Sequence, residues 1–144
     1  MTHSADKSFA QKHPDDARVN PRIRDAIVRR ATAEELPCAV VFEIALQLEV
    51  PPAEVGLNLD LLNYRLIKCQ LGLFGYRPHK KIAQPPADLA PNLKEAIAEK
   101  VREGRLACRH AWEIADRLGV PRLRVGGACE AAGIKVKPCQ LGAF

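Results

Sequence analysis

The chain has 144 residues and a mass of 15.9 kDa, enough for one ordinary domain or two very small ones. Its residues are 47% hydrophobic and 27% charged, a composition that is typical of a globular protein and excludes wholesale disorder. The formal net charge of +5 favours a polyanion or an acidic partner. No apolar run approaches the roughly 18–20 residues that a membrane span requires, so we expect no membrane contact.

The first 20 residues are polar, and no apolar stretch among them resembles a secretory signal. We therefore expect residues 1–20 to be a disordered tail and the protein to be cytoplasmic. The five cysteines are then expected to be reduced thiols, because a disulfide framework usually has an even number of cysteines and a secretory context.

The sequence contains an internal repeat. When residues 21–74 are aligned with residues 91–144 at an offset of 70, no gap is needed and 18 of the 54 positions are identical. Both copies end on Cys-Gln-Leu-Gly, at 69–72 and at 139–142. A repeat of this kind indicates that one structural unit occurs twice in the chain. We take repeat one as residues 21–76 and repeat two as residues 91–144.

A proline-rich basic segment, residues 77–90, separates the repeats and is expected to be a semi-extended linker. Each repeat has about 50 residues, too few to bury a large core alone. We therefore expect the repeats to pack about a pseudo-two-fold axis.

Within each repeat the apolar residues recur with helical spacing. A first helix is expected to begin at Pro21 and Pro91, because proline is tolerated in a first turn, and Gly104 is expected to end it in repeat two. A second helix follows, and the Val-Pro steps at 50–51 and 120–121 should end it. The third helix is expected over 53–62 and 123–132, and a short β segment over 64–67 and 134–137. The predicted fold class is thus mainly α, with two tandem three-helix units.

The second and third helices of repeat two resemble the helix-turn-helix motif of DNA-binding proteins. In that motif an alanine is followed four residues later by a glycine, and apolar residues come next and five beyond. Repeat two has Ala115, Gly119, Val120 and Val125 at these positions, whereas repeat one has Glu49 in place of the glycine. The resemblance implies a helix-turn-helix fold, with the following β segment as a wing, in the helix-turn-helix or winged-helix class.

The resemblance and the charges together predict a DNA-binding protein, a small transcriptional regulator of prokaryotic type that contacts duplex DNA through repeat two. Repeat two has ten Lys and Arg against six Asp and Glu, whereas residues 21–74 have six against seven. DNA backbones are bound by long basic side chains. The expected contacts are the basic residues of repeat two around its second and third helices and its β segment: Arg105, Arg109, Arg117, Arg122, Arg124, Lys135 and Lys137.

Two alternatives stay open. The duplicated fold could serve as a protein-interaction module, with a protein partner or as a homodimer. It could also respond to thiol oxidation or a metal through Cys69 and Cys139, because Lys68 and Lys137 lie nearby in sequence and a cation can lower a thiol pKa. No Cys-x-x-Cys pair, phosphate loop or nucleophile motif occurs, so we expect no cofactor, no metal and no enzyme activity.

Overall fold

The structure is a computed structural model, and it describes residues 9–14, 17–78, 81–84 and 90–143. The described part is mainly helical, as predicted, with four short strands. It divides into two compact units: unit 1 is Met1–Ile67 with Leu141–Ala143, and unit 2 is Lys68–Gln140. In the described residues no helix is both long and apolar enough to cross a membrane.

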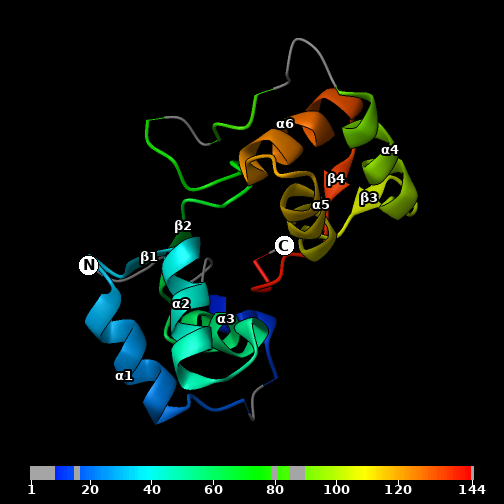
Figure 1. Ribbon diagram of the computed structural model, residues 1–144. Coiled ribbons are helices and arrows are strands. Elements are labelled where there is room, and N and C mark those ends of the chain that lie inside the picture. Colours follow the sequence, from blue (N-terminus) through cyan, green and yellow to red (C-terminus); the bar gives the residue numbers. More distant parts are fainter. Residues whose placement is uncertain (1–8, 15–16, 79–80, 85–89, 144) are drawn as a thin grey trace. The chain divides into compact units, whose positions relative to one another are not determined.

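Corresponding elements of the two units begin 70 residues apart (Figure 1). Unit 1 contains a 3-10 turn, three helices and two strands: η2 (Phe9–Lys12), α1 (Pro21–Arg30), β1 (Glu35–Pro37), α2 (Cys38–Leu48), α3 (Pro52–Leu61) and β2 (Arg65–Ile67). Unit 2 contains three helices and two strands: α4 (Pro91–Lys100), β3 (Arg105–Leu106), α5 (Cys108–Leu118), α6 (Arg122–Ala132) and β4 (Lys135–Val136).

The helix boundaries follow from local chemistry. Pro21 and Pro91 open α1 and α4 as predicted, and the side chain of Asn20 caps α1 by accepting from the N–H groups of Arg22 and Ile23. The prediction that Gly104 ends the first helix of repeat two is wrong, because α4 ends at Lys100. Gly104 instead lies in the tight turn that follows, at a φ of 75° that favours glycine.

The strand after each third helix pairs with another strand of its own unit. In unit 1, β2 pairs in parallel with β1, and in unit 2, β4 pairs in parallel with β3. The two helices between the paired strands supply the long crossover that a parallel pair needs. The strand after the third helix is therefore bound to the body of its unit. Strands β1 and β3 were not predicted, because three and two residues are too few to show a period.

The core of each unit is built from the same positions. In unit 2 the buried side chains of α4, α5 and α6 pack with Leu106 and Val136 of the strands. One position differs in kind: Asn58 on α3 is buried, where repeat two has Ala128. Asn58 is fully engaged, because its Oδ1 accepts from the N–H of Asn20 at 2.7 Å and its Nδ2 donates to the carbonyl of Glu54 at 2.8 Å. It thereby fixes the start of α1 on α3.

Each Cys-Gln-Leu-Gly segment packs against one glycine of a third helix, and that helix belongs to the other repeat. In unit 2, a Cβ added to Gly126 of α6 would lie 2.0 Å from the carbonyl oxygen of Leu71. In unit 1, a Cβ added to Gly56 of α3 would lie 1.9 Å from the carbonyl oxygen of Leu141. Leu71 and Leu141 are both buried. We call this reciprocal arrangement the exchanged turns.

The exchanged turns move the expected domain boundaries. The chain divides after Ile67 and again after Gln140, and not at residue 76. Residues 81–84, which were expected to belong to a free linker, also pack on unit 2: the N–H groups of Ile82 and Ala83 donate to the carbonyl of Gly72, and Lys81 pairs with Glu130 at 2.9 Å. Residues 79–80 and 85–89 of the predicted linker lie outside the described residues.

The predicted disordered tail is wrong for the part of it that the structure describes. The N–H of Phe9 donates to Oδ1 of Asn63 at 2.9 Å, and Lys12 and His13 reach one carboxylate oxygen of Asp60 at 3.1 and 2.8 Å. Residues 9–13 therefore pack against α3 and the turn after it. Residues 1–8 and 15–16 of the predicted tail lie outside the described residues.

Candidate nucleic-acid interface

A tight turn brings two arginines of repeat two side by side. Arg102 and Arg105 exchange backbone hydrogen bonds of 2.9 and 3.0 Å, and the residues between them, Glu103 and Gly104, have φ values of 55° and 75°. Two consecutive positive φ values define the type I′ turn, which suits a two-residue connection. The Arg102 guanidinium also donates to the carbonyls of Glu99 and Val101, so that it covers the end of α4.

Strand β4 brings a lysine to the same place. Lys135 is the register partner of Arg105, and the N–H of Lys137 donates to the carbonyl of Leu106 at 2.8 Å. The next residue, Pro138, accepts from the N–H of Cys108 at the start of α5 at 3.0 Å. These bonds hold Lys137 beside β3 and the first turn of α5.

The result is a groove of about 510 Å³, which we call the basic groove. It is lined by residues from α4, the 102–105 turn, the first turn of α5 and the segment after β4: Lys100, Arg102, Arg105, Ala107, His110, Lys137 and Pro138. Among the described residues that line it, none is an Asp or a Glu. Arg109 lies next to it, with its Nη2 3.5 Å from Nε2 of His110. Four permanent positive charges thus converge on one hollow.

The basic groove gathers some of the expected DNA contacts and leaves out others. Of the predicted residues, Arg105 and Lys137 line the groove and Arg109 adjoins it. Lys135 lies opposite Arg105 in the register of β3 and β4. Lys100, Arg102 and His110 were missed. The signal in the sequence was the run of basic residues on both sides of Gly104, and its meaning depended on a turn that brings them together.

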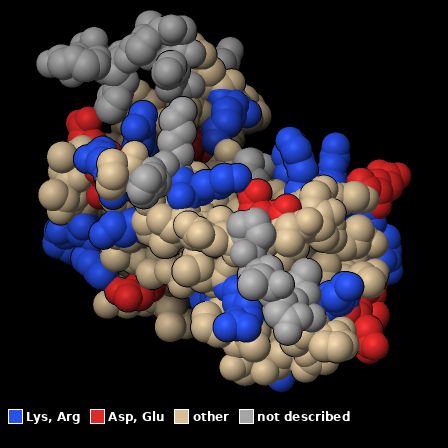
Figure 2. All heavy atoms as spheres, turned by 90° about the horizontal axis from the view of Figure 1, so that it is seen from above, with Lys and Arg blue, Asp and Glu red and all other residues tan. Residues whose placement is uncertain are grey.

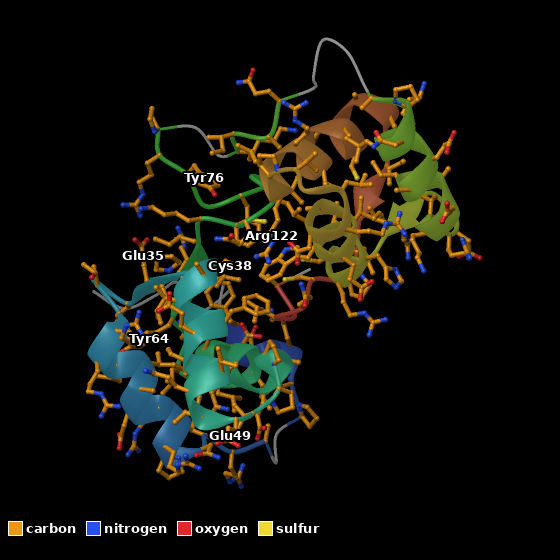
Figure 3. All side chains as sticks on the ribbon, in the orientation of Figure 1. Glu35, Cys38, Glu49, Tyr64, Tyr76 and Arg122 are labelled. Carbon is orange, nitrogen blue, oxygen red and sulfur yellow. The ribbon has the colours of Figure 1, made fainter. Side chains whose placement is uncertain are left out.

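The remaining predicted contacts lie elsewhere on unit 2. Arg117 is exposed in the last turn of α5. Arg124 lines a separate hollow with residues of the 81–84 segment. The guanidinium of Arg122 (Figure 3) lies 3.7 Å from the centre of the Trp112 ring and 3.6 Å from Oδ2 of Asp116. Arg122 is therefore a packed side chain at the start of α6.

Helix α6 is not available as a recognition helix along its middle. Five consecutive residues, Val125–Cys129, are buried. One side faces the helices of unit 2, and backbone covers the other: a Cβ at Gly127 would lie 2.2 Å from the carbonyl oxygen of Gln84, as one at Gly126 would meet Leu71. Glycine fits at positions 126 and 127 because another backbone segment crosses the helix closely there. These two residues have no side chain that could contact a base.

Repeat one has no counterpart of the basic groove. The positions that correspond to its five basic and imidazole side chains carry one arginine and four residues without positive charge: Arg30, Thr32, Glu35, Val40 and Ile67. Arg30 is itself paired with Glu43 at 2.7 Å. On the side that Figure 2 displays, Lys and Arg side chains form several groups with Asp and Glu between them. The basic groove, and not a general excess of positive charge, is therefore the candidate interface.

Three of the cysteines are buried in a way that disfavours the reactive thiolate form. Cys69 is buried, and burial raises the pKa of its thiol, opposite to the effect expected from Lys68. Burial likewise raises the pKa of Cys108, and that of Cys129 to about 11. Cys139 is half-buried, and none of the five cysteines, all of which the structure describes, forms a disulfide. No cluster of three or more His, Cys, Asp or Glu in the described ranges could hold a metal ion.

Comparison with known proteins gives no relative: no protein-family model, curated protein or solved structure matches the chain. The candidate function therefore rests on the residues and their geometry.

Proposed function

We propose that this protein binds duplex DNA through the basic groove of unit 2, and that it acts as a transcriptional regulator, the role that the helix-turn-helix resemblance implies. The observation that carries the proposal is the convergence of Lys100, Arg102, Arg105 and Lys137 on one hollow without an acidic lining residue. A cluster of this kind is a site for phosphate oxygens, which Arg and Lys bind in most protein–DNA contacts.

The start of α5 supports the same proposal. Its first turn has no acidic residue, and no side chain caps it. The positive end of the helix dipole therefore adds to the charge of the basic groove. Phosphate contacts position a protein on a duplex but carry no sequence information, so binding through the basic groove alone has weak sequence preference.

Binding of a fluorescein-labelled 20-base-pair duplex, followed by anisotropy over a salt series, tests the proposal. For contacts with phosphates, the logarithm of the binding constant falls linearly with the logarithm of the salt concentration, by roughly 0.9 for each phosphate neutralised. Replacing Arg105→Gln together with Lys137→Gln should weaken binding and reduce that slope by about two.

The matched control is Arg30→Gln with Arg65→Gln. It removes the same charge from the positions that correspond to Lys100 and Lys135 in repeat one. This control should leave the slope unchanged. A flat salt response of the wild type, or equal losses in the two double variants, would rule out the basic groove as the DNA site.

A second candidate function, a protein-interaction module, is favoured by one exposed side chain. Leu46 on α2 is 82% exposed, where repeat two has Asp116. Single exposed apolar side chains are common on protein surfaces, but Leu46 is the most exposed large apolar side chain among the described residues and is therefore the one to test. Pull-down with wild type and Leu46→Asp tests it: a stoichiometric partner lost only in the variant supports the module, and identical profiles exclude Leu46 as its contact.

We also propose that the two repeats arose by duplication and are related by a pseudo-two-fold axis. The offset of 70 between all corresponding elements supports the duplication. The exchanged turns support the axis, because in a two-fold relation residue i of one partner contacts j of the other and j contacts i, as Gly56 with Leu141 and Gly126 with Leu71 do.

A protease site inserted in the 85–89 segment tests this proposal. After cleavage, each fragment still carries the turn that binds a glycine of the other fragment, so the two should elute together from a size-exclusion column. Separation of the folded fragments would contradict it. The same cleavage of Gly126→Val, which removes one turn contact, should give fragments that separate more readily.

A further inference from the structure

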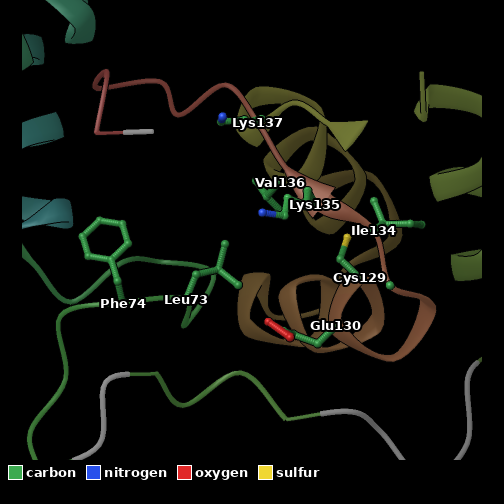
Figure 4. A pocket seen from close by; sticks show the side chains of 9 residues that line it. Leu73, Phe74, Cys129, Glu130, Ile134, Lys135, Val136 and Lys137 are labelled. Carbon is green, nitrogen blue, oxygen red and sulfur yellow. The ribbon is translucent and has the colours of Figure 1, made fainter. Parts of the chain in front are cut away.

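Unit 2 has a second hollow of about 500 Å³ (Figure 4). We call it the apolar pocket. Most of its lining is apolar and comes from the Cys-Gln-Leu-Gly turn region, the end of α6 and β4: Leu73, Phe74, Cys129, Glu130, Gly133, Ile134, Lys135, Val136 and Lys137. Leu73 and Phe74 face the residues of β4 across it.

The charges of the apolar pocket are unequal. Lys135 and Lys137 both line the pocket and are exposed, whereas Val136 between them is buried. The acidic lining residue, Glu130, is held by Lys81, whose Nζ lies 2.9 and 3.0 Å from its two carboxylate oxygens. The pair is close to neutral, which leaves two positive charges at the rim.

We propose that the apolar pocket binds a small apolar carboxylate, with its hydrocarbon part against Leu73, Phe74 and Ile134 and its carboxylate between Lys135 and Lys137. Cavities of 300–1,000 Å³ with an apolar lining and a few polar groups are the usual form of a small-molecule site. Two ammonium groups above an apolar floor select an anion with an apolar body over either feature alone.

Lys137 connects this ligand to the basic groove, because it lines both hollows. Lys135 is the strand-register partner of Arg105, which also lines the groove. A carboxylate bound by Lys135 and Lys137 therefore neutralises positive charge at the edge of the basic groove. The bound ligand should then weaken DNA binding. This second step rests on the proposed function, whereas binding of the carboxylate does not.

The probe is 4-phenylbutyrate, and its neutral amide, 4-phenylbutyramide, is the matched compound. Titration of the 15N-labelled full chain, followed by amide chemical shifts, measures binding without DNA. Saturable shifts confined to residues 73–74 and 129–137 are expected, with about tenfold weaker binding of the amide, because it lacks the charge-assisted bonds. Lys135→Gln should weaken the carboxylate by a similar factor and leave the amide unchanged.

The control Arg65→Gln removes the corresponding charge of repeat one and should leave both compounds unaffected. Since Lys135 is an exposed side chain, the Lys135→Gln protein is expected to keep the wild-type spectrum elsewhere, which verifies folding. No saturable shifts, shifts centred on other residues, or equal affinity for the acid and the amide would each overturn the proposed site.

The anisotropy assay with 4-phenylbutyrate then separates the two steps. A several-fold loss of DNA affinity at saturating carboxylate, absent with the amide, is the expected result. Carboxylate binding without any effect on bound DNA would overturn the connection through Lys137 and keep the site. Absence of DNA binding by the free protein would overturn the proposed function and leave the NMR result standing.

Discussion

The guanidinium of Arg122 lies over the ring of Trp112, 3.7 Å from its centre. Asp116, one turn further along α5, holds the same guanidinium from a distance of 3.6 Å. The arginine thus ties the first residue of α6 to the middle of α5 across the turn between these two helices. In repeat one the three positions are Pro52, Phe42 and Leu46, so this contact exists in repeat two alone.

Replacing Arg122→Ala should therefore affect stability more than DNA binding. A cation over an aromatic face contributes about 0.5–2 kcal/mol, and its loss should lower the free energy of unfolding by about 1 kcal/mol. Trp112 is the single tryptophan of the chain, so its fluorescence follows urea unfolding directly. Arg124→Ala, also in the first turn of α6, should change stability little. A larger effect of Arg122→Ala on DNA affinity than of Arg105→Gln with Lys137→Gln would contradict this assignment.

A methyl group at Gly126 should be destabilising, although alanine normally improves a helix. Alanine in place of glycine within an unobstructed helix stabilises by about 1 kcal/mol. A Cβ added to Gly126 would lie 2.0 Å from the backbone carbonyl oxygen of Leu71. This backbone atom cannot move aside as the end of a flexible side chain can. We expect Gly126→Ala to lower the free energy of unfolding by at least about 2 kcal/mol. Gly56→Ala should behave alike in unit 1.

The control for the glycine variants is Gly133→Ala. Gly133 has a φ of 67° and no neighbouring atom within 4 Å of a built Cβ, so it reports backbone strain alone, about 1 kcal/mol. If Gly126→Ala is as stable as the wild type in urea, the close packing of Leu71 on α6 is wrong.

The turn between α2 and α3 contains avoidable strain. Glu49 adopts φ 57° and ψ 45°, nearly the values of Gly119 in unit 2, and Figure 3 shows it at the end of α2. A left-handed conformation costs a non-glycine residue roughly 1–2 kcal/mol. Glu49→Gly should raise the unfolding free energy by about 0.5–1 kcal/mol, since the freer unfolded chain offsets part of the gain. The reciprocal variant Gly119→Glu should lose a comparable amount; two changes of the same sign would disprove the explanation.

Alkaline pH should destabilise the protein through its buried thiols. An unfolded cysteine ionises near 9.0, whereas burial raises the pKa of Cys129 to about 11. Between these values the folded state binds more protons than the unfolded state, so stability falls as pH rises. For Cys129 the loss approaches about 2–3 kcal/mol at pH 11.

Urea unfolding from pH 7 to 11 under reducing conditions measures this loss. Cys129→Ala should have a flatter pH dependence than the wild type, even if it is less stable at pH 7. Part of the slope remains in that variant, because burial also raises the pKa of Cys69 and Cys108. An unchanged slope would show that Cys129 does not ionise on unfolding.

Much of the fold could be predicted from sequence because its signals are local. Pro21 and Pro91 marked helix starts, and Val50-Pro51 marked the end of a helix, since proline restricts the residues around it. Strands β1 and β3 could not be predicted in this way. Their pairing with β2 and β4 joins segments about 30 residues apart, and two or three residues are too few to show a period.

The candidate site was predictable in composition but not in position. Counting charges identified repeat two, and Arg105 and Lys137 were named from their sequence neighbourhood. Lys100 was not predicted because the 102–105 turn brings it to the groove, and a sequence does not show where a turn leads. Arg122 was predicted as a contact because a sequence does not show that its guanidinium packs on the ring of Trp112.

The exchanged turns also constrain how the two halves of the gene can change. A bulkier residue at position 126 has to be matched by a change near position 71, in the other repeat, and the same holds for positions 56 and 141. One repeat can therefore not be exchanged for a divergent version of the same repeat while the other stays unchanged, even though each repeat has three helices of its own. Loss of one repeat by recombination would leave the other with an uncovered third helix, so such a deletion should be poorly tolerated.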